Sequence, residues 1–222
     1  MLKVYEEKLE AIKADILEIG HEVIDAMEVC FRALQNDHIC DLSNIELSEK
    51  KILAKSNEID NKIIATLALY APEARDLRHL VSYLKITNEL VRTGANAKDF
   101  AKKFKKSFSD DLNTKMILEY TIPLLKSALL SLKTALSIVD EKNEKHVEEK
   151  CRRVIVEESK TDDIFSMIEK NILKLISQDL DLSKEYFDML KALRRLEKIA
   201  DRSVSIANLL QYAEVGGEIV QS

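Results

Sequence analysis

The sequence predicts an all-α protein built from two tandem antiparallel three-helix bundles. Glycine and proline number only 4 and 2 among 222 residues, about a quarter of their average share in proteins. Sandwiches, barrels, propellers and glycine-rich phosphate loops need more of both residues and are disfavoured. Apolar residues make up 46% and charged residues 33%, a composition typical of long amphipathic helices with one buried face.

Turn residues place six helices along the chain. Asn36 and Asp37 form a turn after the first helix, whose apolar residues recur at helical spacing from Ile12 onward. Pro72 is expected in the first turn of the third helix, where its missing N–H does no harm. Gly216 and the next glycine end the last helix. The expected helices are 3–34, 42–70, 72–106, 112–139, 144–178 and 183–213.

A polar linker divides these helices into two sets of three. The linker spans 107–111, and the helices before and after it have similar expected lengths, which indicates an internal duplication. The end of the third helix matches the last helix at an offset of 106, which pairs Leu90 with Leu196. We therefore predict a first bundle at 1–107, a second bundle at 108–215 and a tail at 216–222.

The charge balance and the cysteines favour a cytoplasmic protein that does not bind nucleic acid. Lysine and arginine number 34 against 39 acidic residues, a net charge of −5, so no bulk attraction to nucleic acid exists. The 3 cysteines lack CxxC spacing and indicate free thiols in a reducing compartment. No signal peptide and no long uncharged apolar stretch is apparent.

Five lysines cluster between residues 98 and 106, with phenylalanines between and after them. Basic and aromatic residues together are compatible with nucleic acid or an anionic membrane. A helix C-terminus attracts cations in any case, and Phe100, Phe104 and Phe108 have the spacing of a packing stripe. We therefore favour a structural role for the cluster.

Two motifs carry a family resemblance. Residues 72–78 (PEARDLR) and 85–92 (KITNELVR) resemble a segment of the PhoU family, which has a proline-x-alanine-x-aspartate-leucine-arginine run before a leucine-glutamate-arginine-isoleucine-glycine-aspartate motif. The second half repeats that motif at 196–201 (LEKIAD), with Ser205 where the family usually has asparagine. The resemblance covers nearly the whole chain and implies the two three-helix bundles.

The resemblance also implies a function. Family members regulate bacterial phosphate uptake as partners of the phosphate ABC transporter and of a phosphate-sensing histidine kinase. We therefore expect a non-enzymatic negative regulator of the phosphate-starvation response that binds the transporter ATPase and the kinase. A homodimer is one compatible assembly, and contact with the membrane would occur only through partners. Asp76 and Arg78, in the most family-like run, are the candidate partner-binding residues. Their structural alternative is a helix-dipole contact and an ion pair.

Some family members bind iron or zinc clusters through paired acids four residues apart. Side chains at this spacing lie on one face of a helix, so two carboxylates can share a cation. The complete set occurs only in the second half: Glu158, Asp162, Glu197 and Asp201. Carboxylate oxygens suit iron, manganese, magnesium or calcium better than a structural zinc site. Chance alone gives roughly seven acid pairs at this spacing among 39 acids, so the resemblance carries the hypothesis. Arg202 is expected to compete for the charge of Asp201.

The first half lacks the corresponding acids. Glu49 occupies the position equivalent to Glu158, but Leu53, Val91 and Ala95 replace the other three acids that the family pattern implies. One carboxylate cannot hold a metal cluster, so we predict that any iron, zinc or other divalent metal binds in the second bundle.

Other function classes stay open at this stage. A carboxylate-bridged di-iron protein with oxidase or iron-storage activity is one alternative, although the Glu-x-x-His pairs of ferritin-like sites are absent. A regulator of a different transporter is a second alternative, and a purely structural helical dimer is a third. The sequence contains no HExxH, GxSxG or P-loop motif, which argues against an enzyme.

Overall fold

A computed structural model describes residues 2–218 of the chain, and within this range it contains helices and no strand. The predicted all-α fold class is confirmed. The last four residues of the predicted tail lie outside the described residues. The elements in chain order are α1 (Leu2–Gln35), the 3-10 helix η1 (Ile39–Asn44), α2 (Glu49–Tyr70), α3 (Ala74–Ser107), α4 (Thr114–Leu136), α5 (Glu144–Gln178) and α6 (Ser183–Val215).

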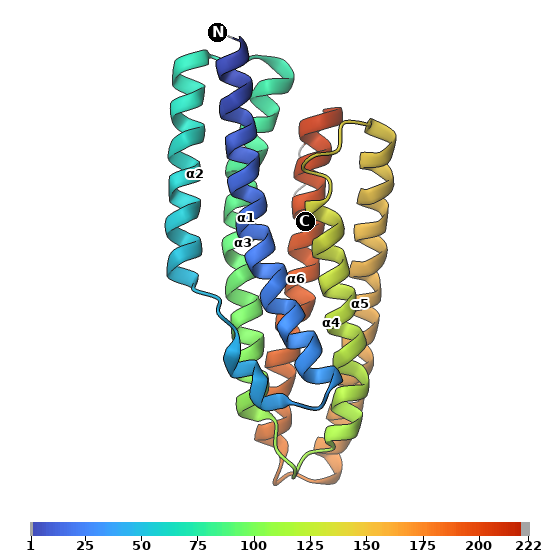
Figure 1. Ribbon diagram of the computed structural model, residues 1–222. Coiled ribbons are helices and arrows are strands. Elements are labelled where there is room, and N and C mark those ends of the chain that lie inside the picture. The colour runs from blue at the N-terminus through green and yellow to red at the C-terminus, as the bar shows by residue number, and fades with distance from the viewer. Residues whose placement is uncertain (1, 219–222) are drawn as a thin grey trace.

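Helices α1 to α3 form one antiparallel bundle, and α4 to α6 form a second bundle beside it (Figure 1). The most extensive contact between any two helices joins α3 to α6, one from each bundle, and these helices run antiparallel. Helices α1 and α4 also touch across the two halves. Helices α2 and α5 lie at the outer edges, so each contacts only the two other helices of its own bundle.

The core is mainly aliphatic. The largest fully buried side chains are isoleucines, leucines and a methionine, together with Tyr83 and the two phenylalanines of α3. Phe100 and Phe104 have 1% and 0% exposure, with ring centres 5.3 Å apart, and Phe108 is partly buried against the same core. The packing interpretation of this stripe is confirmed.

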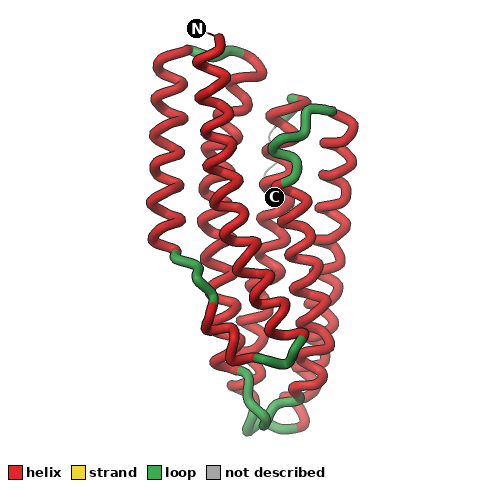
Figure 2. The backbone as a smooth tube through the Cα atoms, in the orientation of Figure 1, coloured by secondary structure: helices red, strands yellow, loops and turns green. Residues whose placement is uncertain are grey.

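The start of the predicted second helix is wrong. Residues 42–44 belong to η1, residues 45–48 are not helical, and α2 begins at Glu49. Ser48 caps α2, because its side-chain oxygen accepts a hydrogen bond from the N–H of Lys51 at 3.4 Å. Figure 2 shows this connection along the side of the first bundle, whereas the other loops lie at the ends of the helices. As a result α2 has 22 residues and α5 has 35, so the halves are less alike than expected.

The predicted start of the third helix is two residues early. Ala71 ends α2 with a left-handed φ of 43°, and α3 begins at Ala74, so Pro72 lies in the connection rather than in the first turn. In the second half, α5 has the predicted bounds, with Asn143 as its N-cap. Helix α4 is shorter than predicted at both ends, because Asn113 caps it and the chain turns after Leu136.

Candidate metal centre

Three of the four predicted carboxylates meet between α5 and α6. One oxygen from each of Glu158, Asp162 and Asp201 lies within 4.8 Å of the other two. The first two residues are four apart on α5 and share one helix face, and α6 packs antiparallel against that face. This is the one group of three or more acidic, histidine or cysteine side chains at such spacing within residues 2–218.

Burial and neighbouring carboxylates raise the pKa of two members of this trio. Partial burial raises the pKa of Glu158, and the charges of Asp162 and Asp201 raise it further. Partial burial and the charge of Asp201 likewise raise the pKa of Asp162. Both shifts disfavour the ionised forms, first because burial removes solvating water and second because the neighbouring carboxylates repel added negative charge.

Glu197 does not join the trio. Its carboxylate lies 3.4 Å from Arg194 Nε and 3.7 Å from Lys198 Nζ. Two cations therefore flank this carboxylate, and it is not one of the three whose oxygens lie within 4.8 Å of one another. Its Oε2 atom is buried and has no hydrogen-bond partner among the described residues. Burial is the main cause of the raised pKa of Glu197.

Lys198 partly neutralises the trio. Its Nζ donates a hydrogen bond of 2.7 Å to Asp201 Oδ2. Arg202 does not compete for Asp201 as predicted, because its guanidinium lies 2.8 Å from Glu89 Oε2 on α3. The Ser205 hydroxyl donates a hydrogen bond of 3.3 Å to the backbone oxygen of Asp201.

The donor set fits a hard divalent or trivalent cation. All three donors are carboxylate oxygens on two helices, and a cation between them would relieve both the loss of solvation and the mutual repulsion that raise the pKa of Glu158 and that of Asp162. No histidine or cysteine belongs to the group, so the oxygen-ligated metals fit better than a structural zinc ion. The absence of histidine also separates this group from ferritin-like di-iron sites.

The first half presents no comparable group within the described residues. Glu49 is exposed at the first position of α2, and its nearest cation is Lys98, with Nζ 3.6 Å from Oε1. Leu53 is 50% exposed one turn further along. Val91 and Ala95 are half-buried on α3.

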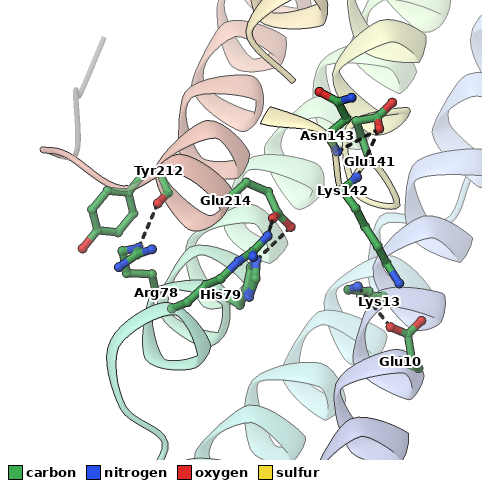
Figure 3. Close-up of polar contacts among 10 residues, drawn as sticks. Glu10, Lys13, Arg78, His79, Glu141, Lys142, Asn143, Tyr212 and Glu214 are labelled. Carbon is green, nitrogen blue, oxygen red and sulfur yellow. Dashed lines mark hydrogen bonds and ion pairs between the residues drawn. The ribbon is translucent and has the colours of Figure 1, made fainter. Parts of the chain in front are cut away.

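The predicted partner-binding residues lie at the start of α3. Asp76 is half-buried in the first turn, where a carboxylate complements the helix dipole. Arg78 Nε donates a hydrogen bond of 3.2 Å to the backbone oxygen of Tyr212 on α6, and Figure 3 shows the two residues facing each other. The contact made by Arg78 is therefore with a helix C-terminus rather than with a neighbouring acid.

The sequence did not reveal a buried ionic cluster beside Arg78. Glu214, near the end of α6, contacts Arg75, and its Oε1 lies 2.9 Å from Nε2 of the buried His79 (Figure 3). Burial opposes ionisation of Glu214, but its hydrogen bonds to His79 and Arg75 lower its pKa to about 2. The partners are more than 130 residues apart in sequence, so only the antiparallel register of α3 and α6 could have predicted the cluster.

None of the helices within residues 2–218 has the length and hydropathy needed to cross a bilayer. Two antiparallel three-helix bundles, with an acidic cluster between the outer helix and the central helix of one bundle, define a class of all-helical proteins. The PhoU domain model matches residues 16–104 and 123–210, one copy in each half. The chain belongs to the PhoU family.

Curated relatives match the chain over nearly its whole length. A protein of Clostridium acetobutylicum, named phosphate-specific transport system accessory protein PhoU homolog, is 25% identical over 221 residues, which cover 98% of this chain and 97% of that protein. A relative of the same name from Rhizobium meliloti is 24% identical over 98% of this chain and 90% of its own.

Solved structures share the fold. The phosphate transport system regulatory protein PhoU from Streptococcus pneumoniae superposes with a TM-score of 0.79 at 19% identity, covering 98% of this chain and 100% of that one. PhoU from Pseudomonas aeruginosa gives a TM-score of 0.81 at 19% identity, covering 96% and 100%.

Proposed function

We propose that this protein regulates phosphate uptake by binding partners in the cytoplasm, without catalysing a reaction. The partners are the ATPase of a phosphate ABC transporter and a phosphate-sensing histidine kinase, and the outcome is repression of the phosphate-starvation response. The observation that carries the proposal is the presence of a PhoU domain in each half, with full-length relatives named as accessory proteins of phosphate-specific transport.

A metal ion bound by Glu158, Asp162 and Asp201 would supply positive charge between α5 and α6. The carboxylates of the two helices would hold it, with Glu197 as a neighbouring acid. With the ion bound, the metal would neutralise the charge of Asp201 in place of Lys198, and the lysine side chain could turn outward. The trio would thereby fix the position of the outer helix of the second bundle relative to α6.

The outer surface of α5 is the proposed docking face. Large apolar side chains are exposed on this helix on both sides of the acidic trio, among them Val156 at 53% and Met167 at 52%. Such side chains are common at protein interaction sites, where a partner removes them from water. Asp76 and Arg78, at the start of α3, are a second proposed contact.

Docking would act through a population shift. A regulator that contacts one conformation of the kinase better than the other stabilises that conformation in proportion to the difference in affinity. We propose that the conformation held by this protein is the non-signalling one when phosphate is sufficient.

Crosslinking of the tagged protein in its native host, followed by mass spectrometry, tests the proposed partners. We expect to recover the phosphate transporter ATPase or the kinase with the wild type, and less of either with a Val156→Lys/Met167→Lys variant. The matched control is Ile64→Lys/Leu69→Lys, which adds two charges at exposed apolar positions of α2, the outer helix of the first bundle. Recovery of another transporter's ATPase would support the alternative partner, and recovery of neither component would refute the proposal.

A further inference from the structure

A basic groove of about 520 Å³ lies between η1 and the C-terminal part of α3. It is far along α3 from Asp76 and lies in the bundle without the acidic trio. Its lining residues are Leu42, Ser43, Ile45, Lys98, Ala101, Lys102, Lys105 and Lys106.

Most of the lysines in the groove have no acidic partner. Lys102 and Lys106 form no ion pair with any described residue, and Lys105 contacts only the Ser43 hydroxyl and the backbone oxygen of Cys40. Lys98 faces the exposed carboxylate of Glu49 at 3.6 Å. This concentration of cations occurs in a protein of net charge −5, so the groove presents a local positive field.

The wall of the groove is fixed in place. Leu42 of η1 is buried in the core, and the same 3-10 helix provides Ser43, whose hydroxyl holds Lys105. Leu42, Ile45 and Ala101 add an apolar surface between the lysines. The acids of this segment, Asp41 and Glu46, are exposed and do not line the groove.

The second half provides an internal comparison. At the offset of 106 that aligns α3 with α6, the lysines at 98, 102, 105 and 106 correspond to Val204, Asn208, Gln211 and Tyr212. Helix α6 has no basic residue in its last turn, so the bundle fold does not require these lysines. The helix dipole accounts for cations in the last turn of α3, but not for Lys98 or Lys102.

We propose that this groove binds an organic phosphate of nucleotide size. The lysines would contact the phosphates, and Leu42, Ile45 and Ala101 would contact the base. A volume of about 520 Å³ matches a small-molecule site, whereas inorganic phosphate would fill little of it and would leave the apolar wall unused. This site is independent of the proposed metal and of the proposed protein partners.

Titration calorimetry with ATP, at about 50 mM salt and with a chelator present to keep metals out, tests the proposal. We expect ATP to bind the wild type and to bind a Lys102→Gln/Lys106→Gln variant at least about tenfold more weakly, since each lysine supplies a charge-assisted contact. The matched control is Lys115→Gln/Lys126→Gln, which removes the same charge from two exposed positions of α4. The control should stay within about twofold of the wild type, and circular dichroism verifies that both variants fold.

Two further probes test whether the groove recognises the whole nucleotide or the phosphates alone. Tripolyphosphate should bind more weakly than ATP, because it lacks a base, and adenosine should not bind. Equal binding of ATP to the wild type and the groove variant, equal weakening by the control, or no ATP binding at low salt would overturn the proposal. Binding of vesicles rich in anionic lipid without binding of ATP would also overturn it, in favour of a membrane surface, and tripolyphosphate binding as tightly as ATP would overturn the nucleotide assignment.

Discussion

Lys198 Nζ lies 2.7 Å from Asp201 Oδ2, inside the acidic group that the second bundle builds between α5 and α6. The ammonium group supplies one positive charge to a site with three neighbouring carboxylates. This partial compensation explains how the trio persists in the fold while the pKa of Glu158 and that of Asp162 stay raised.

Replacing Lys198 should strengthen metal binding. A Lys198→Met variant loses the cation that competes for Asp201, so we expect its affinity for Mn²⁺ to rise by about two- to fivefold, the range of an exposed ion pair. Titration calorimetry of both proteins measures the change. Lys191→Met is the control. Lys191 lies seven residues before Lys198 on α6 and forms a similar ion pair, with Asp188. A lower affinity in Lys198→Met would show that the lysine supports the site instead of competing with the metal.

Removing one carboxylate of the trio should stabilise the metal-free protein. The raised pKa of Glu158 means that folding disfavours its ionised form. We therefore expect Glu158→Gln to raise the free energy of unfolding at pH 7 by about 0.5 kcal/mol, a value discounted for partial exposure. Urea denaturation with a chelator present measures it. The control is Glu49→Gln at the equivalent position of the first half, which should give no gain because Glu49 faces Lys98. A loss of stability in Glu158→Gln would contradict this account of the site.

Glu214 should strongly stabilise the interface between the two bundles. Its buried carboxylate contacts Arg75 and His79, so Glu214→Gln leaves both partners with a weaker acceptor. We expect the free energy of unfolding at pH 7 to fall by about 2 kcal/mol. Glu148→Gln, which removes a half-exposed carboxylate 3.9 Å from Arg152, should change it by less than about 0.5 kcal/mol. Equal effects of the two substitutions in urea denaturation would refute the role assigned to Glu214.

The contribution of Glu214 to the free energy of unfolding should decrease as the solution becomes more acidic. Its pKa is lowered from 4.5 to about 2 in the folded protein, so its contribution is present above the unfolded value and is lost as the pH falls toward the folded value. The difference in stability between the wild type and Glu214→Gln should thus shrink as the pH falls from 4.5 toward about 2. Chemical denaturation at a series of pH values measures this difference, and a difference that grows on acidification would contradict the assignment.

The fold was predictable from local signals, and the errors have local causes. Scarce turn residues and the apolar spacing were sufficient for six helices, and Asn143 as the N-cap made the bounds of α5 correct. The start of α2 was wrong because helical periodicity continues through residues 42–48, whereas the cap at Ser48 sets the boundary. Pro72 is compatible with a first helical turn, but the left-handed Ala71 places it in the connection.

The candidate site was predictable only in part. The four-residue spacing on α5 and the family pattern identified Glu158, Asp162 and Asp201, which the fold brings together. The ion pairs of Glu197 with Arg194 and Lys198 were not predictable, because the spacing and the family pattern say nothing of which side-chain conformations these residues adopt. Contacts across the two halves, such as that of Arg202 with Glu89, depend on how the bundles pack and leave no signal in one sequence.

The central claim is that the second bundle holds a metal through carboxylates that the first bundle has lost. Elemental analysis and Mn²⁺ titration of the purified wild type beside Asp162→Ala/Asp201→Ala and Glu49→Gln test it most directly. We predict that the wild type and Glu49→Gln bind metal equally, whereas the double variant binds it at least about tenfold more weakly. Equal metal binding by the wild type and the double variant, or no uptake by the wild type, would contradict the claim.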